Sequence, residues 1–191
     1  LLECKRVNKI IMKGIVFTEF LELVENKFGL EMVDTIIINS DLKSNGVYTS
    51  VGTYSFSEML QLLTHLSELT GISTDDLLLI YAEHFFEVIK KSYPELLDAY
   101  TDPMEMISSI ENHIHVEVKK IYPDAELPTF EIVKKTSNSL IMIYKSSRAM
   151  HHFGLGLMKK TFEYFNVTSE IKLKKLNAQG TRVEFNISTH Q

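Results

Sequence analysis

The chain has 191 residues, of which 45% are hydrophobic and 24% are charged, so it can bury the core of one domain and disorder is not expected. Its net charge of -5 disfavours a nucleic-acid partner, and no apolar run approaches the roughly 20 residues that a membrane helix needs. The single cysteine, Cys4, excludes an internal disulfide and fits a reducing, cytoplasmic setting.

The first 11 residues precede Met12-Lys13-Gly14 and contain no initiator methionine. We interpret residues 1–11 as an upstream or artificially added leader outside the fold, with a short native tail as the alternative. The fold is then expected to comprise residues 12–191.

The first half of the sequence predicts helices. Apolar residues recur at helical spacing over residues 15–28, and a second, short helix is expected near residues 32–39. Ser55-Phe-Ser-Glu58 is typical of a capping box at the start of a helix that Gly71 ends. Residues 73–76 open the next helix, Pro94 begins a short segment, and another helix follows Pro103 and runs to about residue 122.

The second half predicts strands. Residues 130–134 and 140–148 form a hairpin, residues 153–165 return to helix, and strands follow at 170–176 and 182–188. Helices followed by strands with one embedded helix indicate an α+β fold with an antiparallel sheet.

Three polar residues in the second predicted strand are spaced two apart, at Tyr144, Ser146 and Arg148. Residues two apart on a strand point to the same face, so two hydroxyls and a guanidinium would project together. Such a set can bind carboxylates, because Arg pairs with them through two parallel hydrogen bonds. An ordinary polar strand face is the alternative interpretation.

Two histidines, His113 and His115, lie on the helix before Tyr122-Pro123. Residues two apart on a helix face nearly opposite ways, so the two cannot hold one metal together. Either one could hold a haem iron as a neutral imidazole, and periodicity does not choose between them. A solvent-facing or otherwise satisfied histidine is the alternative. No nucleophile, base and orienting group occur at a recognisable spacing, so an enzyme is not expected.

Taken together, these motifs resemble the H-NOX family, the haem domain of bacterial nitric oxide and oxygen sensors and of soluble guanylate cyclase. The resemblance covers nearly all of the chain from Met12 onward, and its most specific element is the Tyr-x-Ser-x-Arg motif. It implies haem b as the cofactor, a helical lobe at residues 12–75 and a haem-bearing lobe at residues 76–191.

The resemblance also assigns the haem contacts. In relatives that end the helix with Tyr-Pro the iron ligand lies seven residues before the Tyr, which selects His115 and leaves His113 aside. The motif residues that hold the haem propionates correspond to Tyr144, Ser146 and Arg148. The proline that packs against and distorts the haem corresponds to Pro128, and the distal contact near the start of the chain corresponds to Val16.

The resemblance favours nitric oxide, and also carbon monoxide, over oxygen. Oxygen-binding relatives carry a distal tyrosine five residues after the motif Arg, where this chain has Phe153. The supporting polar positions correspond to Leu78 and Phe85, so the predicted distal pocket is apolar. The interpretation weakens if Tyr81 or His84 turns inward.

By the same resemblance, nitric oxide weakens the bond from iron to His115 and the two lobes move relative to each other. The chain is too short to add a kinase or cyclase domain, so a separate effector is expected, either a histidine kinase or a cyclic-di-GMP enzyme. An oxygen sensor and a haem-free interaction module are the alternatives.

Overall fold

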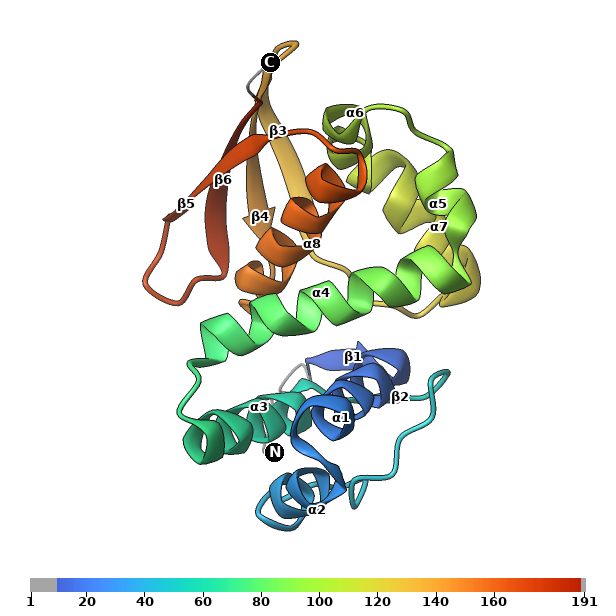
Figure 1. Ribbon diagram of the computed structural model, residues 1–191, viewed down its shortest axis with the longest axis vertical. Coiled ribbons are helices and arrows are strands. Elements are labelled where there is room, and N and C mark those ends of the chain that lie inside the picture. Colours follow the sequence, from blue (N-terminus) through green and yellow to red (C-terminus); the bar gives the residue numbers. More distant parts are fainter. Residues whose placement is uncertain (1–9, 190–191) are drawn as a thin grey trace, which may run out of the picture.

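The computed structural model of the chain describes residues 10–189, and Cys4 lies outside the described residues. In Figure 1, helix α4 (Thr74–Ser92) crosses the molecule between two groups of elements. The first group holds helices and a two-stranded sheet: β1 (Ile11–Lys13), α1 (Gly14–Phe28), α2 (Leu30–Ile38), β2 (Thr53–Ser55) and α3 (Phe56–Thr70). The second group holds the remaining helices α5 (Pro94–Asp98), α6 (Pro103–Ser108), α7 (His115–Ile121) and α8 (His151–Tyr164), and the strands β3 (Thr129–Lys135), β4 (Ser139–Lys145), β5 (Ser169–Lys175) and β6 (Arg182–Thr189).

Several predicted features of the helices are confirmed, both in the residues that they bury and in the residues at their ends. Phe17 and Phe20 of α1 are fully buried, as the apolar spacing predicts. Gly71 ends α3 in the left-handed conformation at φ 72°, which glycine adopts without steric cost. Ser73 caps α4, since its hydroxyl accepts the N–H of Asp76 at 3.1 Å.

The predicted capping box at the start of α3 is wrong. The Ser55 hydroxyl pairs with that of Ser57 at 2.8 Å and caps no backbone N–H. Glu58 is only 3% exposed and accepts hydrogen bonds from the hydroxyls of Ser44 and Tyr48, at 2.5 and 2.9 Å. The carboxylate therefore fastens the loop between α2 and β2, because a buried charge requires hydrogen-bond donors.

The helix expected after Pro103, running to about residue 122, is present but interrupted. α6 ends at Ser108, a π-helical turn covers Ile110–Ile114 (η1), and α7 begins at His115. The Ile114 N–H reaches the carbonyl of Ser109, five residues back, at 3.4 Å. A π-turn inserts one residue into the helical repeat and so rotates the residues that follow it; such turns occur often at functional sites.

The sheet confirms the α+β prediction. Its order is β3-β4-β6-β5 with every neighbouring pair antiparallel, and α8 lies against it (Figure 1). Leu140, Met142 and Tyr144 of β4 alternate into the core, opposite Ile187, Phe185 and Val183 of β6.

The strand face predicted for the Tyr-x-Ser-x-Arg motif is only partly present. β4 ends at Lys145, so Ser146 and Arg148 lie in the turn before α8 rather than on the strand. The turn includes Ala149 at φ 53°. The two-residue periodicity of a strand therefore does not explain how these side chains are oriented.

The end of the expected leader belongs to the fold. Ile11 is part of β1 and pairs with Ser55, and the Ile10 carbonyl accepts the Phe56 N–H at 2.9 Å. Excluding residues 10 and 11 from the fold was thus wrong, because their backbone groups complete the two-stranded sheet.

Two main hydrophobic clusters form the core. One packs α1, α2 and α3 and includes Leu77, Leu78 and Tyr81 from α4. The other joins the sheet to α8. The lobe boundary expected at residues 75 and 76 thus falls at the beginning of α4, the helix that packs against both groups of elements. Among the described residues, no helix is long and apolar enough to cross a membrane.

Candidate functional site

A cavity of about 320 Å³ lies among α1, α4, α7, α8 and the loop before β3. Its walls are mostly aliphatic and aromatic, with a few polar side chains among them. A concave, largely apolar site with few polar groups is the usual form of a ligand or cofactor pocket.

All but one of the predicted cofactor contacts line this cavity: His115, Tyr144, Ser146, Arg148, Pro128, Val16, Phe153 and Phe85. The exception is Leu78, which is 7% exposed in the core cluster around α1. The fold therefore brings together residues that are separated by up to 137 positions in the sequence.

His115 is positioned by a carboxylate one helical turn earlier. Its Nδ1 lies 3.1 Å from Oε1 of Glu111, and the same oxygen accepts the backbone N–H of Phe130 on β3 at 2.9 Å. Burial lowers the pKa of His115 below its ordinary value, although the Glu111 carboxylate acts in the opposite direction. The imidazole is thus held in the neutral form that can bind a metal.

His113 lies outside the cavity. Its Nδ1 lies 2.6 Å from the Tyr100 hydroxyl, and its side chain is 39% exposed. The π-turn and the start of α7 thus send the two histidines in different directions, and His115 is the only histidine of residues 10–189 that lines the cavity.

Arg148 forms a buried cationic edge of the cavity. Its guanidinium donates to the carbonyl of Ile11 at 2.8 Å and to the carbonyl of Glu126, and it lies 3.6 Å from the Glu126 carboxylate. Only 8% of the Arg148 side chain is exposed, against 52% for Glu126. Burial lowers the pKa of Arg148 and raises that of Tyr144. Because the Glu126 carboxylate is exposed, another carboxylate can replace it as the partner of the buried Arg148 guanidinium.

An aromatic wall, made of Phe85 and Phe153, lines another part of the cavity, with the two ring centroids 5.5 Å apart. Behind it, the fully buried Tyr81 donates its hydroxyl to the Val16 carbonyl at 2.6 Å. His84 turns toward Glu19 on α1, with Nε2 at 3.3 Å from Oε2. Neither Tyr81 nor His84 lines the cavity, so neither weakens the interpretation of this wall as apolar.

A pair of tyrosine side chains at the cavity was missed by sequence reasoning. Tyr93, at the end of α4, and Tyr122, just after α7, both line the cavity, and their hydroxyl oxygens lie 3.3 Å apart. Glu111 was also missed. Its i,i+4 spacing from His115 was a usable signal, whereas only the fold brings Tyr93 to Tyr122.

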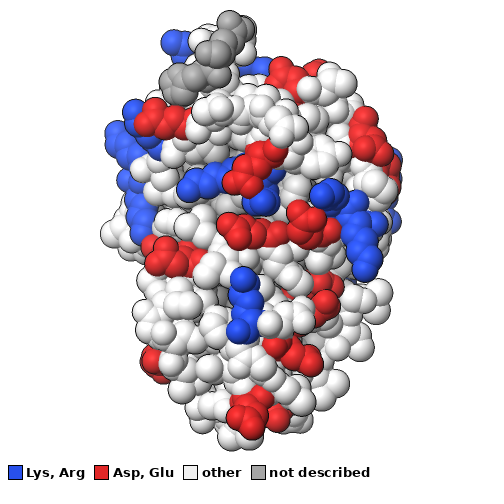
Figure 2. All heavy atoms as spheres, in the orientation of Figure 1, with Lys and Arg blue, Asp and Glu red and all other residues white. Residues whose placement is uncertain are grey.

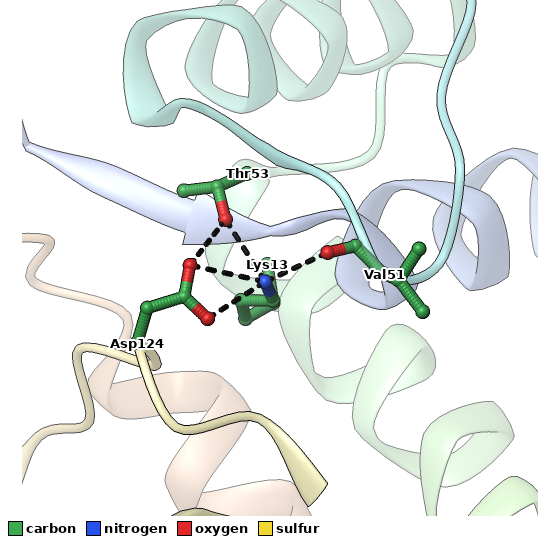
Figure 3. A network of polar contacts seen from close by, with 4 residues as sticks. All are labelled: Lys13, Val51, Thr53 and Asp124. Carbon is green, nitrogen blue, oxygen red and sulfur yellow. Dashed lines mark hydrogen bonds and ion pairs between the residues drawn. The ribbon is translucent and has the colours of Figure 1, made fainter.

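A polar network joins the loop after α7 to the small sheet (Figure 3). The Lys13 ammonium donates to both carboxylate oxygens of Asp124, at 3.0 and 3.2 Å, to the Thr53 hydroxyl and to the Val51 carbonyl. Thr53 also donates to Asp124 at 2.8 Å. The segment that follows the His115 helix is thus tied directly to β1 and β2.

Comparison with known proteins decides the family. Residues 13–173 match the sequence model of the haem-NO-binding family, which is most of the chain. The chain belongs to this family. Haem is the cofactor that the family binds, so the predictions of an H-NOX protein and of a haem cofactor are confirmed. Among proteins with curated descriptions, none matches the chain.

Solved H-NOX structures share the fold. The crystal structure of the Fe(II) unliganded H-NOX protein from K. algicida is 70% identical, covers 94% of this chain and 97% of its own, and has a TM-score of 0.92. The H-NOX from Shewanella woodyi, solved in solution with IWP-051 in the Fe(II)CO state, is 36% identical with a TM-score of 0.79, covering 94% of this chain and 95% of its own. An H-NOX protein from Shewanella oneidensis in the Fe(II)NO state, 20% identical, covers 94% of this chain and all of its own with a TM-score of 0.85, which shows the shared fold.

The cavity of this H-NOX chain fits haem in three respects. It is largely apolar, as a porphyrin ring requires, and a neutral imidazole held through Nδ1 lines it. A buried guanidinium stands at its edge, where the carboxylates of the cofactor need a partner.

Proposed function

We propose that this H-NOX chain is a nitric oxide sensor that holds ferrous haem through His115 and signals to a separate effector protein. The observation that carries the proposal is the position of His115, which lines the cavity while His113 does not. When bound, ferrous haem supplies an iron with an open position at which nitric oxide can bind.

Glu111 orients the His115 imidazole for binding to iron in this proposal. A carboxylate 3.1 Å from Nδ1 accepts the proton there and leaves the lone pair of Nε2 free for iron. A hydrogen-bonded carboxylate also makes the imidazole a stronger donor to the metal. Because Glu111 is itself held by the Phe130 N–H, the direction of the imidazole is fixed from β3 as well as from the helix.

The remaining predicted contacts complete the proposed haem site. Arg148 pairs with the propionates, supported by the hydroxyls of Tyr144 and Ser146. Pro128 and Val16 contact the macrocycle. Leu78 is not included in this proposal, because it lies in the core rather than at the cavity.

The aromatic wall supports nitric oxide, and carbon monoxide, over oxygen. Bound oxygen carries partial negative charge and needs a hydrogen-bond donor in a dry pocket, whereas nitric oxide does not. Phe85 and Phe153 offer none, and the Tyr81 hydroxyl already donates to the Val16 carbonyl. The Tyr93 and Tyr122 hydroxyls, which lie 3.3 Å apart at the cavity, are donors that an oxygen-binding alternative could use.

The Lys13 network supports a route for the signal. If nitric oxide releases His115, α7 is freed to shift, and Asp124 lies three residues beyond its end. Movement of Asp124 acts on Lys13 and Thr53, and through them on β1 and β2 (Figure 3). The chain then acts as a two-state element biased by a ligand, a sensor rather than an enzyme. Family precedent points to a histidine kinase or a cyclic-di-GMP enzyme as the effector.

The surface charge supports a protein effector rather than a nucleic acid. Figure 2 shows acidic and basic side chains interspersed over one face, and the net charge of the chain is -5. Nucleic-acid binding requires a concentrated basic surface. The single cysteine supports the proposed cytoplasmic, reducing setting, and no membrane partner is proposed.

The test is an absorption spectrum of the reduced protein without oxygen, then with air, then with nitric oxide. We expect the haem band to shift with nitric oxide and not with air. The His115→Gly variant should lose haem and regain it with added imidazole, while His113→Gly should behave as the wild type. A stable spectrum of an oxygen complex would make oxygen the ligand, and absence of a haem band after reconstitution would favour a haem-free module.

A further inference from the structure

We propose that Glu19, Glu22 and His84 form a binding site for a divalent first-row metal ion between α1 and α4. Glu19 and Glu22 lie on α1, three residues apart and hence on one face of the helix. His84 comes from α4, which crosses next to α1 in Figure 1. The site is separate from the haem cavity, since none of the three residues lines it.

The three side chains already have nearly the spacing of ligands around one ion. One ligand atom from each lies within 4.8 Å of the other two, and His84 Nε2 is 3.3 Å from Glu19 Oε2. Bonds of about 2.0–2.2 Å to Zn²⁺ place tetrahedral ligand atoms about 3.3–3.6 Å apart. Small rotations of the Glu22 side chain, which is exposed, suffice to close the remaining distance.

Over the described residues, no lysine or arginine neutralises the two carboxylates of the cluster. Within residues 10–189, neither Glu19 nor Glu22 forms an ion pair with a lysine or arginine, and the partner of the Glu19 carboxylate is the His84 imidazole. The side chains of Glu19 and His84 are each 18% exposed, so water has limited access to both of them. Glu22 is exposed and leaves an approach for the ion and for a water ligand.

The ligand chemistry selects the class of metal. One imidazole with two carboxylates suits zinc and its neighbours, whereas calcium and magnesium prefer shells made only of oxygen. Three protein ligands with room for water give an incomplete shell, as in open zinc sites. We therefore assign Zn²⁺ as the first ion to test and Co²⁺ as its spectroscopic substitute.

Such an ion would fasten together α1 and α4, two helices that line the haem cavity through Val16 and Phe85. Glu19 lies one turn after Val16 on α1, and His84 is adjacent to Phe85 on α4. The same interface carries the hydrogen bond from Tyr81 to the Val16 carbonyl. A bound metal would therefore oppose relative movement of α1 and α4. This consequence rests on the proposed function, but the metal site itself does not.

The test is equilibrium dialysis of the haem-loaded protein against Zn²⁺, with metal content measured directly. Cys4 and His190, which lie outside the described residues, are first replaced by Ser and Asn in every protein, because thiolate and imidazole also bind zinc. We expect one equivalent of zinc, and affinity at least tenfold weaker in Glu22→Gln and in His84→Asn. The matched control is His65→Asn, since His65 lies 3.2 Å from the Glu68 carboxylate and pairs with no second carboxylate in the described part of the chain.

Glu22→Gln keeps the test decisive, because an exposed side chain can be changed without unfolding the protein, as circular dichroism will verify. Equal zinc binding by the wild type and this variant, or no saturable binding at all, would overturn the proposal, as would an equal loss in His65→Asn. With Co²⁺, visible bands that disappear in His84→Asn would support nitrogen ligation. Metal content is read independently of the haem band, so failure of the metal site and failure of the gas-sensor proposal are distinguished.

Discussion

One oxygen of Glu111 faces His115 Nδ1 at 3.1 Å and also accepts the Phe130 N–H at 2.9 Å. The carboxylate thus couples three elements: the π-turn that carries it, the helix that begins at His115, and strand β3. The contact with His115 and the hydrogen bond from Phe130 can be separated by substitution, because glutamine retains a carbonyl oxygen but no charge, whereas alanine retains neither.

We expect Glu111→Ala to lower the free energy of unfolding by about 1–3 kcal/mol, because the half-buried Phe130 N–H loses its acceptor. Glu111→Gln should cost less, since its amide oxygen can take over. Both should lower the iron–histidine stretching frequency in resonance Raman spectra of the reduced haem protein, since the imidazole loses a charged acceptor. Glu117→Gln on α7, where Glu117 pairs with Lys120, is the control. An unchanged frequency in both Glu111 variants would contradict the proposed role of the carboxylate.

Phe153→Tyr tests the choice of gas. It adds a hydroxyl to the aromatic wall, and one net hydrogen bond of about 1.4 kcal/mol corresponds to about tenfold tighter binding of oxygen. We expect the reduced variant to form more oxygen complex than the wild type at the same oxygen pressure, measured by absorbance, and little change in nitric oxide binding. Phe165→Tyr, at the end of α8 and away from the cavity, should leave both unchanged. Equal oxygen affinity in wild type and Phe153→Tyr would show that this wall does not decide the ligand.

His151 makes stability depend on pH. The residue is 3% exposed, its Nδ1–H donates to the Gly180 carbonyl at 3.1 Å, and its Nε2 finds no hydrogen-bond partner among residues 10–189. Burial, followed by the charges of His152 and Lys175, lowers the pKa of His151 below its ordinary value. The unfolded chain therefore takes up a proton near pH 6.5 that the folded protein resists.

The stabilising contribution of neutral His151 is therefore complete above about pH 6.5 and is lost as the pH falls through the folded pKa. Urea unfolding at about pH 8 and about pH 5.5 should show a larger loss of stability in the wild type than in His151→Gln. His65→Gln, at a more exposed histidine, is the control and should keep the wild-type dependence. An identical pH dependence in His151→Gln would mean that the proton binds elsewhere.

Sequence reasoning is most accurate for features that residues close together in the chain determine, such as the ends of helices. Gly71 ends α3 because only a left-handed residue fits there, and Ser73 caps α4 because its hydroxyl reaches the Asp76 N–H. Sequence reasoning failed where tertiary contacts override local preference. Ser55 and Glu58 have the spacing of a capping box, yet burial commits Glu58 to the hydroxyls of Ser44 and Tyr48.

The candidate site shows the same division. Tyr144, Ser146 and Arg148, which the family resemblance grouped as one set of contacts, all line one cavity, but strand periodicity does not explain this, since β4 ends at Lys145. The π-turn before His115 has no signature in hydrophobic spacing, because it adds one residue to an otherwise regular helix. The pairing of Tyr93 with Tyr122 joins segments 29 residues apart and is created only by packing.

The last prediction concerns the contact between α4 and α8, the two helices that meet at Gly156 and Ala82. A methyl group added at Gly156 would overlap with the Cβ of Ala82 and lie 3.3 Å from the Leu79 carbonyl oxygen. Alanine in place of glycine within a helix usually stabilises by about 0.5–1 kcal/mol, whereas overpacking of a tight interface costs about 1–3 kcal/mol. Overpacking dominates here, because the atoms in contact belong to backbone and Cβ positions that cannot rotate away. Gly156→Ala should therefore lower the free energy of unfolding, measured in urea.

Gly154→Ala on the same helix is the control. There the added methyl meets only a Phe130 ring atom at 3.9 Å, so the free energy of unfolding should be unchanged or higher. In the Ala82→Gly background the same Gly156→Ala change should become neutral or stabilising, a coupling that a double-mutant cycle measures directly. Destabilisation that persists undiminished in that background would show that the Leu79 carbonyl, and not Ala82, sets the distance between the two helices.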